Sequence, residues 1–352
     1  MQSDAELDES KPPCIVIDTN AWVSELFLRS PTGVALIYRL RQSRIALGLP
    51  EIIEREIARN AIKQMGEWKA AIEQHSRKLF AVTGQLNIEH LPGNAQIEAA
   101  SRNVTAELEG LFLRIPFTLD HARSALDRVE SGLPPNHRNQ QFKDSAIWEA
   151  VLELARTHRV HFVTNDGAFY EKTTEGEETV AANLRGECER NDAAVTLYRA
   201  LSSCLKSLQQ GVIAKPFDSR AVASEIEKSL DRALLAEMAT TSDCRFTGER
   251  ISESVSAFLT GKMDELAVDF ELTYRLEGAG EDEAAQALAP AMTVKGDCFY
   301  DVTTRKVSDV RASIYQLSNL SPSCAMLLKL IQTPHQPLGA GESRTVFRSL
   351  KL

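Results

Sequence analysis

The chain has 352 residues and a formal net charge of −9 at pH 7, with 43% hydrophobic and 25% charged residues. This composition is typical of a globular protein. It excludes nucleic-acid binding through overall charge, because a net negative field repels phosphates, so such a partner would need a local basic groove. No apolar run reaches the length that spans a bilayer, and the acidic start MQSDAELDESKPP lacks the apolar core of a secretory signal.

The length and the cysteines predict a two-domain protein of a reducing compartment. Chains of this size commonly fold as two domains. We expect a flexible arm at residues 1–13, a first domain at 14–190 and a second at 191–352. The six cysteines form no C-x-x-C pair, which argues against a zinc ribbon or a disulfide framework. A cytoplasmic protein is therefore predicted.

The first domain begins with elements typical of a parallel sheet. The run CIVID is short, β-branched and apolar on both faces, which predicts a buried strand. A helix is expected from Ser30, a second buried strand at IALGLP, and another helix from Pro50. A long helical insert follows at about residues 60–132, broken at LPGN and IPFT.

The end of the first domain continues this alternation. After the polar loop LPPNHRNQQ, the apolar residues of KDSAIWEAVLELART have helical spacing, and HRVHFVTND predicts a further parallel strand. Strands that alternate with helices indicate an α/β fold, a parallel sheet flanked by helices. A fragment that ends near residue 190 is expected to fold alone.

The pattern changes beyond residue 190. NDAAVTLYRALSSCLKSLQ and SRAVASEIEKSLDRALLAEMA are predicted helices, whereas LAVDFELTYRLE alternates apolar and polar residues as a half-buried strand does. AMTVKGDCFYDV and VRASIYQLS predict two more strands around a turn at TTRK. We expect a smaller α+β domain, helices followed by antiparallel strands, with no motif that assigns it a role.

Two aspartates stand where buried strands end. Asp18 follows CIVI and Asp166 comes shortly after VHFV, and the carboxyl ends of parallel strands line the crevice where α/β proteins bind ligands. A carboxylate beside a buried strand is costly to desolvate unless a cation joins it, and a divalent ion with oxygen ligands does so. The alternative is a turn or N-cap role, which Asp commonly fills.

Two further acids become candidate site residues only through their order along the chain. Asp144 stands at the start of a helix, where a carboxylate favours the helix dipole by roughly 0.3–1 kcal/mol, and Glu56 alone is typical of a solvated residue near Arg59. Taken in order, the motifs IDTN, LPEIIEREI, FKDSAIWEAVLE and VTND resemble the PIN-domain nuclease family over residues 14 to about 170. The interval between Glu56 and Asp144 is longer than in compact members of that family.

The resemblance implies a set of site residues, in which the family's acidic quartet falls on Asp18, Glu56, Asp144 and Asp166, with Asn20 and Thr164 as polar supports. Glu51 and Glu54 share the helix of Glu56. Neither lies a full helical turn from Glu56. In a single orientation of the helix, therefore, only one of the three side chains should face the site.

The resemblance also implies the chemistry. Clustered carboxylates repel one another, and one or two Mg²⁺ or Mn²⁺ ions would remove that cost and activate water for in-line attack on a phosphodiester. RNA is implied as the usual substrate, cut by hydrolysis, which predicts a metal-dependent endoribonuclease. The basic residues expected to bind nucleic acid are Lys143 and Arg138, and those expected to flank the crevice with them are Arg39, Arg41, Arg44 and Lys63; the alternative for each is ordinary solvated surface.

The residues also allow other functions. A catalytically silent PIN-fold module that binds RNA or serves as a scaffold would keep the fold without the reaction. A toxin or defence effector is a further hypothesis, consistent with a second domain that binds a protein partner or a second copy of the chain; no membrane partner is expected. An aspartyl-phosphate phosphatase is disfavoured because Asn20 stands where that chemistry needs a second Asp, and the seven histidines show no metal-ligand spacing.

Overall fold

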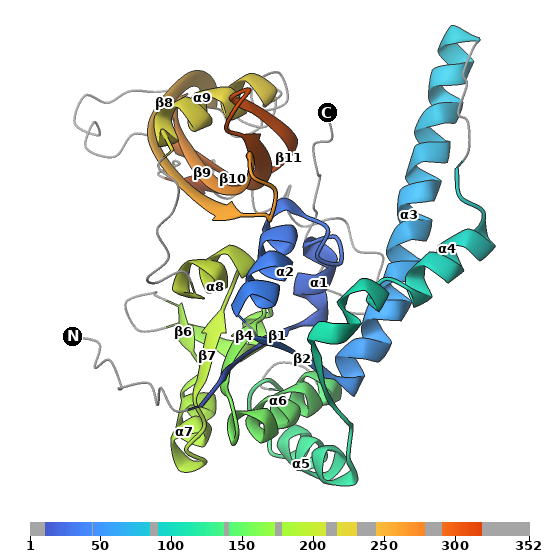
Figure 1. Ribbon diagram of the computed structural model, residues 1–352, viewed down its shortest axis with the longest axis vertical. Helices are drawn as coiled ribbons and strands as arrows, with labels where there is room; N and C mark the ends of the chain where they lie inside the picture. Colours follow the sequence, from blue (N-terminus) through green and yellow to red (C-terminus); the bar gives the residue numbers. More distant parts are fainter. Residues whose placement is uncertain are drawn as a thin grey trace. The chain divides into compact units, whose positions relative to one another are not determined.

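The structure, a computed structural model, describes residues 11–43, 45–84, 91–136, 141–172, 178–208, 217–230, 244–278 and 291–318. The chain divides into two compact units (Figure 1). The first comprises Met1–Arg29 and Leu36–Gly211, and the second comprises Ser30–Ala35 and Val212–Leu352. None of the described helices is both long enough and apolar enough to cross a membrane.

A five-stranded parallel sheet forms the centre of the first unit, with strand order β3-β2-β1-β4-β7. Its strands are β1 (Pro13–Ile17), β2 (Ala46–Pro50), β3 (Phe112–Ile115), β4 (Arg159–Val163) and β7 (Val195–Tyr198). The four residues of β1 after Pro13 are fully buried, as expected for the middle strand of a sheet covered on both faces. The predicted α/β class is confirmed.

Helices cover both faces of this sheet. Figure 1 shows α5 and α6 on one face, with α2 and α8 on the other. The helices are α1 (Thr19–Ser24), α2 (Pro31–Ser43), α3 (Glu51–Thr83), α4 (Asn94–Arg102), α5 (Leu119–Glu130), α6 (Phe142–Ala155), α7 (Ala182–Arg190) and α8 (Leu201–Leu208). Shorter elements are the 3-10 helices η1 (Ala106–Leu111) and η2 (Gly167–Phe169) and the hairpin of β5 (Tyr170–Lys172) and β6 (Glu178–Val180).

The packing of α6 on the sheet needs a glycine in β2. A Cβ atom at Gly48 would lie 2.8 Å from Val16 Cγ2 and 3.0 Å from Leu154 Cδ2, closer than packed carbon atoms approach. Trp148 and Val151 of α6 are fully or almost fully buried in the same layer. A small residue in β2 therefore lets the end of α6 near Leu154 lie close against the sheet.

Two strands of the first unit lie in segments predicted as helices. β3 lies inside the expected helical insert, and β7 lies in NDAAVTLYRALSSCLKSLQ, of which only the part at α8 is helical. Both strands have four residues, too few to show a period of their own, and pairing with β2 and β4 decides their conformation. The expected boundary near residue 190 falls before β7, inside this unit.

One predicted segment differs from the structure at its end, and parts of others lie outside the described residues. Pro13, assigned to the flexible arm, is the first residue of β1, and Lys11 Nζ donates hydrogen bonds to the main-chain oxygens of Ala155 and Asp192 at 3.3 and 2.9 Å. Residues 1–10 of that arm lie outside the described residues, as do residues 137–140 of the predicted polar loop and residues 231–239 of the second predicted helix beyond 190.

The second unit contains a four-stranded antiparallel sheet of order β11-β10-β9-β8. Its elements are α9 (Ser219–Ser229), β8 (Cys244–Leu259), β9 (Glu265–Gly278), β10 (Ala291–Asp301) and β11 (Lys306–Ser318). Val222 and Ile226 of α9 belong to the same buried cluster as Phe270 and Leu272 of β9. The smaller α+β domain is confirmed, although β8 was not among the predicted strands.

A fragment of residues 1–211 should unfold cooperatively on heating, whereas a fragment of residues 1–190 should melt at a clearly lower temperature or fail to fold. The shorter fragment lacks β7 and the buried Leu201 and Leu205 of α8, and it leaves the edge of β4 unpaired. Circular dichroism melts of the two fragments make the comparison. Equal melting temperatures would show that β7 and α8 are dispensable to this unit.

Candidate active site

The ends of β1 and β4 bring Asp18 and Asp166 to one edge of the sheet. The two strands are parallel neighbours in which Ile17 pairs with Val163, and Asp18 N donates a hydrogen bond to Val163 O at 2.9 Å. In the sheet, β2 and β3 lie on one side of β1, and β4 and β7 lie on the other, so the strand order reverses next to β1. Ligands of open α/β sheets bind at such a reversal of strand order.

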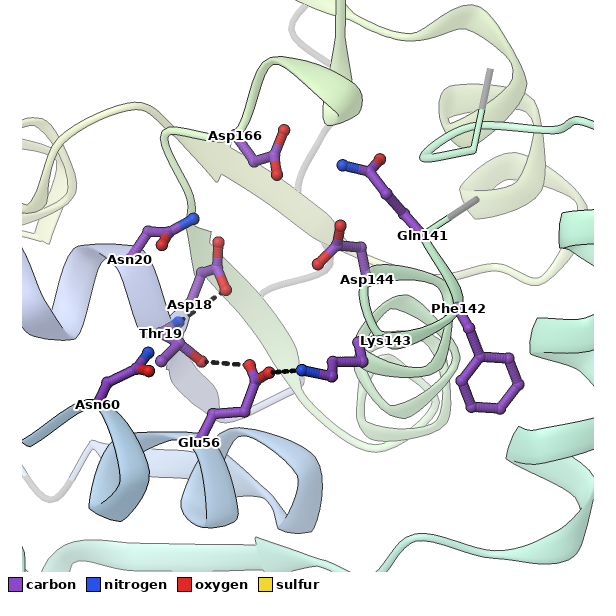
Figure 2. Close-up of a pocket in the computed structure, with 10 residues that line it drawn as sticks. All are labelled: Asp18, Thr19, Asn20, Glu56, Asn60, Gln141, Phe142, Lys143, Asp144 and Asp166. Carbon is purple, nitrogen blue, oxygen red and sulfur yellow. Dashed lines mark hydrogen bonds and ion pairs between the residues drawn. The ribbon is translucent and has the colours of Figure 1, made fainter. Parts of the chain in front are cut away.

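Two helices supply the other predicted acids to this edge. α6 precedes β4 and packs against the sheet, with Asp144 in its first turn, and α3 follows β2 and carries Glu56 near its start. A pocket of about 580 Å³ forms there, lined by Asp18, Thr19, Asn20, Glu56, Asn60, Gln141, Phe142, Lys143, Asp144 and Asp166. In Figure 2 the carboxylates of Asp18, Asp144 and Asp166 turn toward one common space.

Asp18 is the most deeply placed of the four acids, with only 5% of the residue exposed. Its Oδ1 accepts a hydrogen bond from Thr19 N at 2.7 Å and its Oδ2 accepts one from Thr164 Oγ1 at 2.9 Å. Burial raises the pKa of Asp18 to about 6, against the lowering effect of these hydrogen bonds, and the charges of Asp166 and Glu56 raise it further. Asp18 thus both caps the N-terminus of α1 and lines the pocket.

Asp144, in the first turn of α6, is the second acid of the pocket with a raised pKa. Burial raises its pKa to about 7, the charges of Asp18, Asp166 and Glu56 add to the rise, and Lys143 opposes it. Among the described residues no hydrogen bond or ion pair reaches its carboxylate. Asp166, in contrast, accepts a hydrogen bond on Oδ1 from Ala168 N at 2.8 Å and so caps η2 while it lines the pocket.

Glu56 is the acid of α3 that faces the pocket. Its Oε1 accepts from Lys143 Nζ at 2.6 Å and from Arg59 Nη2 at 3.3 Å, and its Oε2 accepts from Thr19 Oγ1 at 3.0 Å. Figure 2 shows its carboxylate between Thr19 and Lys143.

The other two acids at the start of α3 bind elsewhere. Glu54 accepts from Arg114 of β3 at 3.1 and 3.2 Å, and Glu51 accepts from Phe117 N at 2.9 Å. The orientation of the helix thus places Glu56, and neither of these, among the pocket-lining residues.

The predicted supporting residues divide into two kinds. Asn20 is exposed and lines the pocket, whereas Thr164 is fully buried and acts through its hydrogen bond to Asp18. The main chain of Thr164 is itself fixed, because its N donates to Tyr198 O at 2.9 Å and its O accepts from Tyr170 Oη at 3.0 Å. These bonds connect the position of Asp18 to β7.

The predicted basic residues are less concentrated at the pocket than expected. Lys143 lines it. Arg39 and Arg41 donate instead to the main-chain oxygens of Leu208 and Glu107, at 2.8 and 3.4 Å, and with Lys63 they are absent from the described lining. Arg138 and Arg44 lie outside the described residues.

Four lining residues had no role in the sequence analysis: Thr19, Asn60, Gln141 and Phe142. Asn60 lies one turn after Glu56, so the helical period could have found it once Glu56 was chosen. Gln141 and Phe142 directly precede Lys143 and Asp144 at the start of α6, and their direction depends on where that helix begins.

The chemistry of the lining suits a hard divalent ion. Mg²⁺ and Mn²⁺ prefer carboxylate, hydroxyl and amide oxygens, and the pocket offers these without any Cys or His among its described lining. Among the residues that the structure describes, the carboxylate of Asp144 has no partner, and a cation would balance its negative charge. As the side chains are placed, however, no group of three or more His, Cys, Asp or Glu among the described residues could hold a metal ion. The donors fit by type, and Glu56 is already bound to Lys143.

Comparison with known families decides the classification of this region. Residues 15–169 match the family model of the PIN domain. This part of the chain belongs to the PIN-domain family. No curated protein and no solved structure matches the chain. PIN domains are generally nucleases that act on nucleic acid, and they typically use divalent metals.

The metal-free PIN domain should become less stable as pH rises from 3.8, the ordinary pKa of Asp, to about 7. In that range folded Asp144 still holds a proton that the unfolded chain has released, so deprotonation favours unfolding. Asp144→Asn removes the titrating charge. In chelator it should therefore melt several degrees above the unchanged protein at pH 8 and at about the same temperature at pH 4.

Asp120→Asn is the matched control, because Asp120 occupies the first turn of α5 and its side chain is 91% exposed. This change should leave the melting temperature unchanged or lower it slightly at both pH values, through the weak helix-dipole effect and the exposed ion pair with Arg123. Differential scanning calorimetry makes the measurement. If Asp144→Asn has a lower melting temperature than the unchanged protein at pH 8, the charge of Asp144 does not destabilise the folded domain as described.

Proposed function

We propose that the PIN domain is a divalent-metal-dependent endoribonuclease that hydrolyses RNA phosphodiester bonds. The observation that carries this proposal is the convergence of Asp18, Glu56, Asp144 and Asp166 from four separate elements on one open pocket at the reversal of strand order. Crowded carboxylates without a matching set of protein cations are unfavourable unless they bind something positive. One or two Mg²⁺ or Mn²⁺ ions, when bound, would activate water and stabilise the charge on the phosphorus oxygens.

The residues of the chain have distinct parts in this proposal. Asp18, Asp144 and Asp166 would hold the divalent ion, and Glu56 would complete the acidic set. Thr164 and the main-chain N–H of Thr19 orient Asp18 through hydrogen bonds to its two oxygens. Such second contacts orient the ligands of metal sites, and their loss commonly lowers activity about 10–100-fold.

The rim of the pocket supports a nucleic acid as substrate. Phe142 is 39% exposed on the lining, where its ring offers a face on which an unpaired base can stack, an interaction worth about 1–3 kcal/mol per base. The amides of Asn20, Asn60 and Gln141 lie around the same opening and can donate to sugar, base or phosphate oxygens. With Lys143 they provide local contacts that a net charge of −9 does not.

A catalytically silent module that binds RNA or serves as a scaffold is the second candidate. The placement of Glu56 against Lys143, together with the absence of a ready metal group among the described residues, favours it. The raised pKa values of Asp18 and Asp144 favour the enzyme, because a silent module gains no stability from crowded acids. A toxin or defence role would rest on the second unit as the part that binds a protein partner or another copy.

Purified protein should cleave labelled RNA in Mg²⁺ or Mn²⁺, and cleavage should stop in chelator. Asp18→Asn, Asp144→Asn and Asp166→Asn should each lower the cleavage rate by at least about a hundredfold, more than loss of a supporting contact. Glu56→Gln should also lower the cleavage rate strongly. Gel analysis of cleavage products, with circular dichroism to establish folding, gives the comparison.

Glu54→Gln is the control, since Glu54 lies on the same helix as Glu56 but binds Arg114 away from the pocket. It should cleave at nearly the unchanged rate. Metal-dependent RNA binding without any cleavage would select the silent module. Full activity in folded Asp18→Asn protein would remove the acids from the reaction.

A further inference from the structure

Lys143 occupies an unusual place among the residues of the pocket. It is the one cationic side chain in the described lining, and it lies directly before Asp144 at the start of α6. Its Nζ is 2.6 Å from Glu56 Oε1, which joins α6 to α3 across the opening (Figure 2). The Lys143 side chain is 54% exposed, whereas that of Glu56 is 17% exposed.

The acids of the pocket differ in how many hydrogen-bond donors the protein supplies to them. Both oxygens of Glu56 are occupied, by Lys143 and Arg59 on one and by Thr19 on the other. Asp144 receives no such donor among the described residues. One acid of the quartet is thus paired within the protein, while the carboxylate of Asp144 has no donor in the described part of the chain.

We propose that Lys143 is an internal counter-ion of the metal-free pocket, which competes with the divalent ion for Glu56. This inference rests on the proposed metal-dependent function. When the ion binds, the Lys143 ammonium leaves Glu56 and becomes available to the phosphate oxygens of the substrate. The same side chain therefore stabilises the empty pocket and contacts nucleic acid in the loaded one.

The properties of lysine suit this exchange. Its charge sits at the end of a flexible four-carbon stem, and a single half-exposed ion pair is weak enough for a divalent ion to displace. Arg59 also donates to Glu56 Oε1, at 3.3 Å, but it does not line the pocket. It can remain on Glu56 without occupying the space of the ion.

A purely structural role for Lys143 is the competing explanation. In that case the ion pair would only join α6 to α3, and its removal would lower the melting temperature without changing metal affinity. Exchange predicts the opposite result for affinity, since a cation that competes for Glu56 weakens binding of another cation. The affinity of the protein for the metal alone, without RNA, therefore separates the two explanations.

The test is isothermal titration of the full chain with Mn²⁺ at pH 7.5 and constant ionic strength. Lys143→Met should bind Mn²⁺ about tenfold more tightly, the effect that one unit charge a few ångström from a divalent ion produces in a water-exposed site. Lys143→Arg should return to nearly the unchanged affinity because it keeps the cation. Arg77→Met, which removes the same net charge from an 82% exposed side chain roughly 30 Å further along α3, should stay within about threefold because distant exposed charges are screened.

The outcomes separate this inference from the proposed function on which it rests. Unchanged or weaker Mn²⁺ binding by folded Lys143→Met would overturn the exchange, as would equal tightening in Arg77→Met. If binding is nevertheless lost in Asp18→Asn, the metal site stands and only the role of Lys143 falls. Binding that is absent from the unchanged protein, or that Asp18→Asn leaves intact, would overturn the metal site and this inference together.

Discussion

Repulsion between carboxylates at the carboxyl edge of one parallel sheet is the constraint on which the rest of this PIN domain depends. Asp18 is buried at the end of the middle strand, and Asp144 lies beside it with no cation on its oxygens among the described residues. Burial raises the pKa of both, the charges of Asp166 and Glu56 raise both further, and the charge of Asp18 raises that of Asp144. A fold that keeps these groups together without a ligand loses stability at neutral pH. The arrangement becomes favourable when positive charge enters the pocket.

The surrounding structure holds the acids in place against that repulsion. Thr164 fixes Asp18, and its own main chain is held by hydrogen bonds to Tyr198 and Tyr170. The helix of Asp144 is anchored behind the pocket by a buried arginine of α5. Arg128 pairs with Glu149 of α6 at 2.7 Å and with Glu187 of α7 at 2.9 Å.

That anchor also limits how the pocket can respond. Arg128 is 7% exposed, and removing one partner of such a buried pair leaves an uncompensated charge. The main chain of α6 is thereby held at its packed position. The adjustable part of the pocket is then the Lys143 side chain, which is half-exposed and carries one of the few opposite charges near the acids.

Much of the site could be predicted because strand ends leave a clear signal. An apolar run that stops at a carboxylate identified Asp18 and Asp166, and the parallel pairing of their strands makes them neighbours. The choice of Glu56 over Glu54 could not be derived from the helix alone. It depends on Arg114, which binds Glu54 from β3, and β3 is a four-residue strand inside a segment with a helical pattern.

The remaining differences have the same physical origin. β7 is also too short to show a period, and its conformation follows from pairing with β4. β8 has many polar residues on its exposed face, and its place in the sheet comes from pairing with β9. Phe142 and Gln141 take their direction from the exact start of α6, which local sequence determines poorly. Long-range pairing, rather than local preference, decides each of these cases.

The most direct measurement of the central claim is anomalous X-ray diffraction at the manganese absorption edge from crystals soaked in Mn²⁺. We expect at least one anomalous peak in the pocket, in coordination contact with Asp18 and with Asp144 or Asp166, and no such peak in crystals of Asp18→Asn protein. A pocket without anomalous density in well-ordered, Mn²⁺-saturated crystals would contradict the account. So would a peak in contact with none of the four acids.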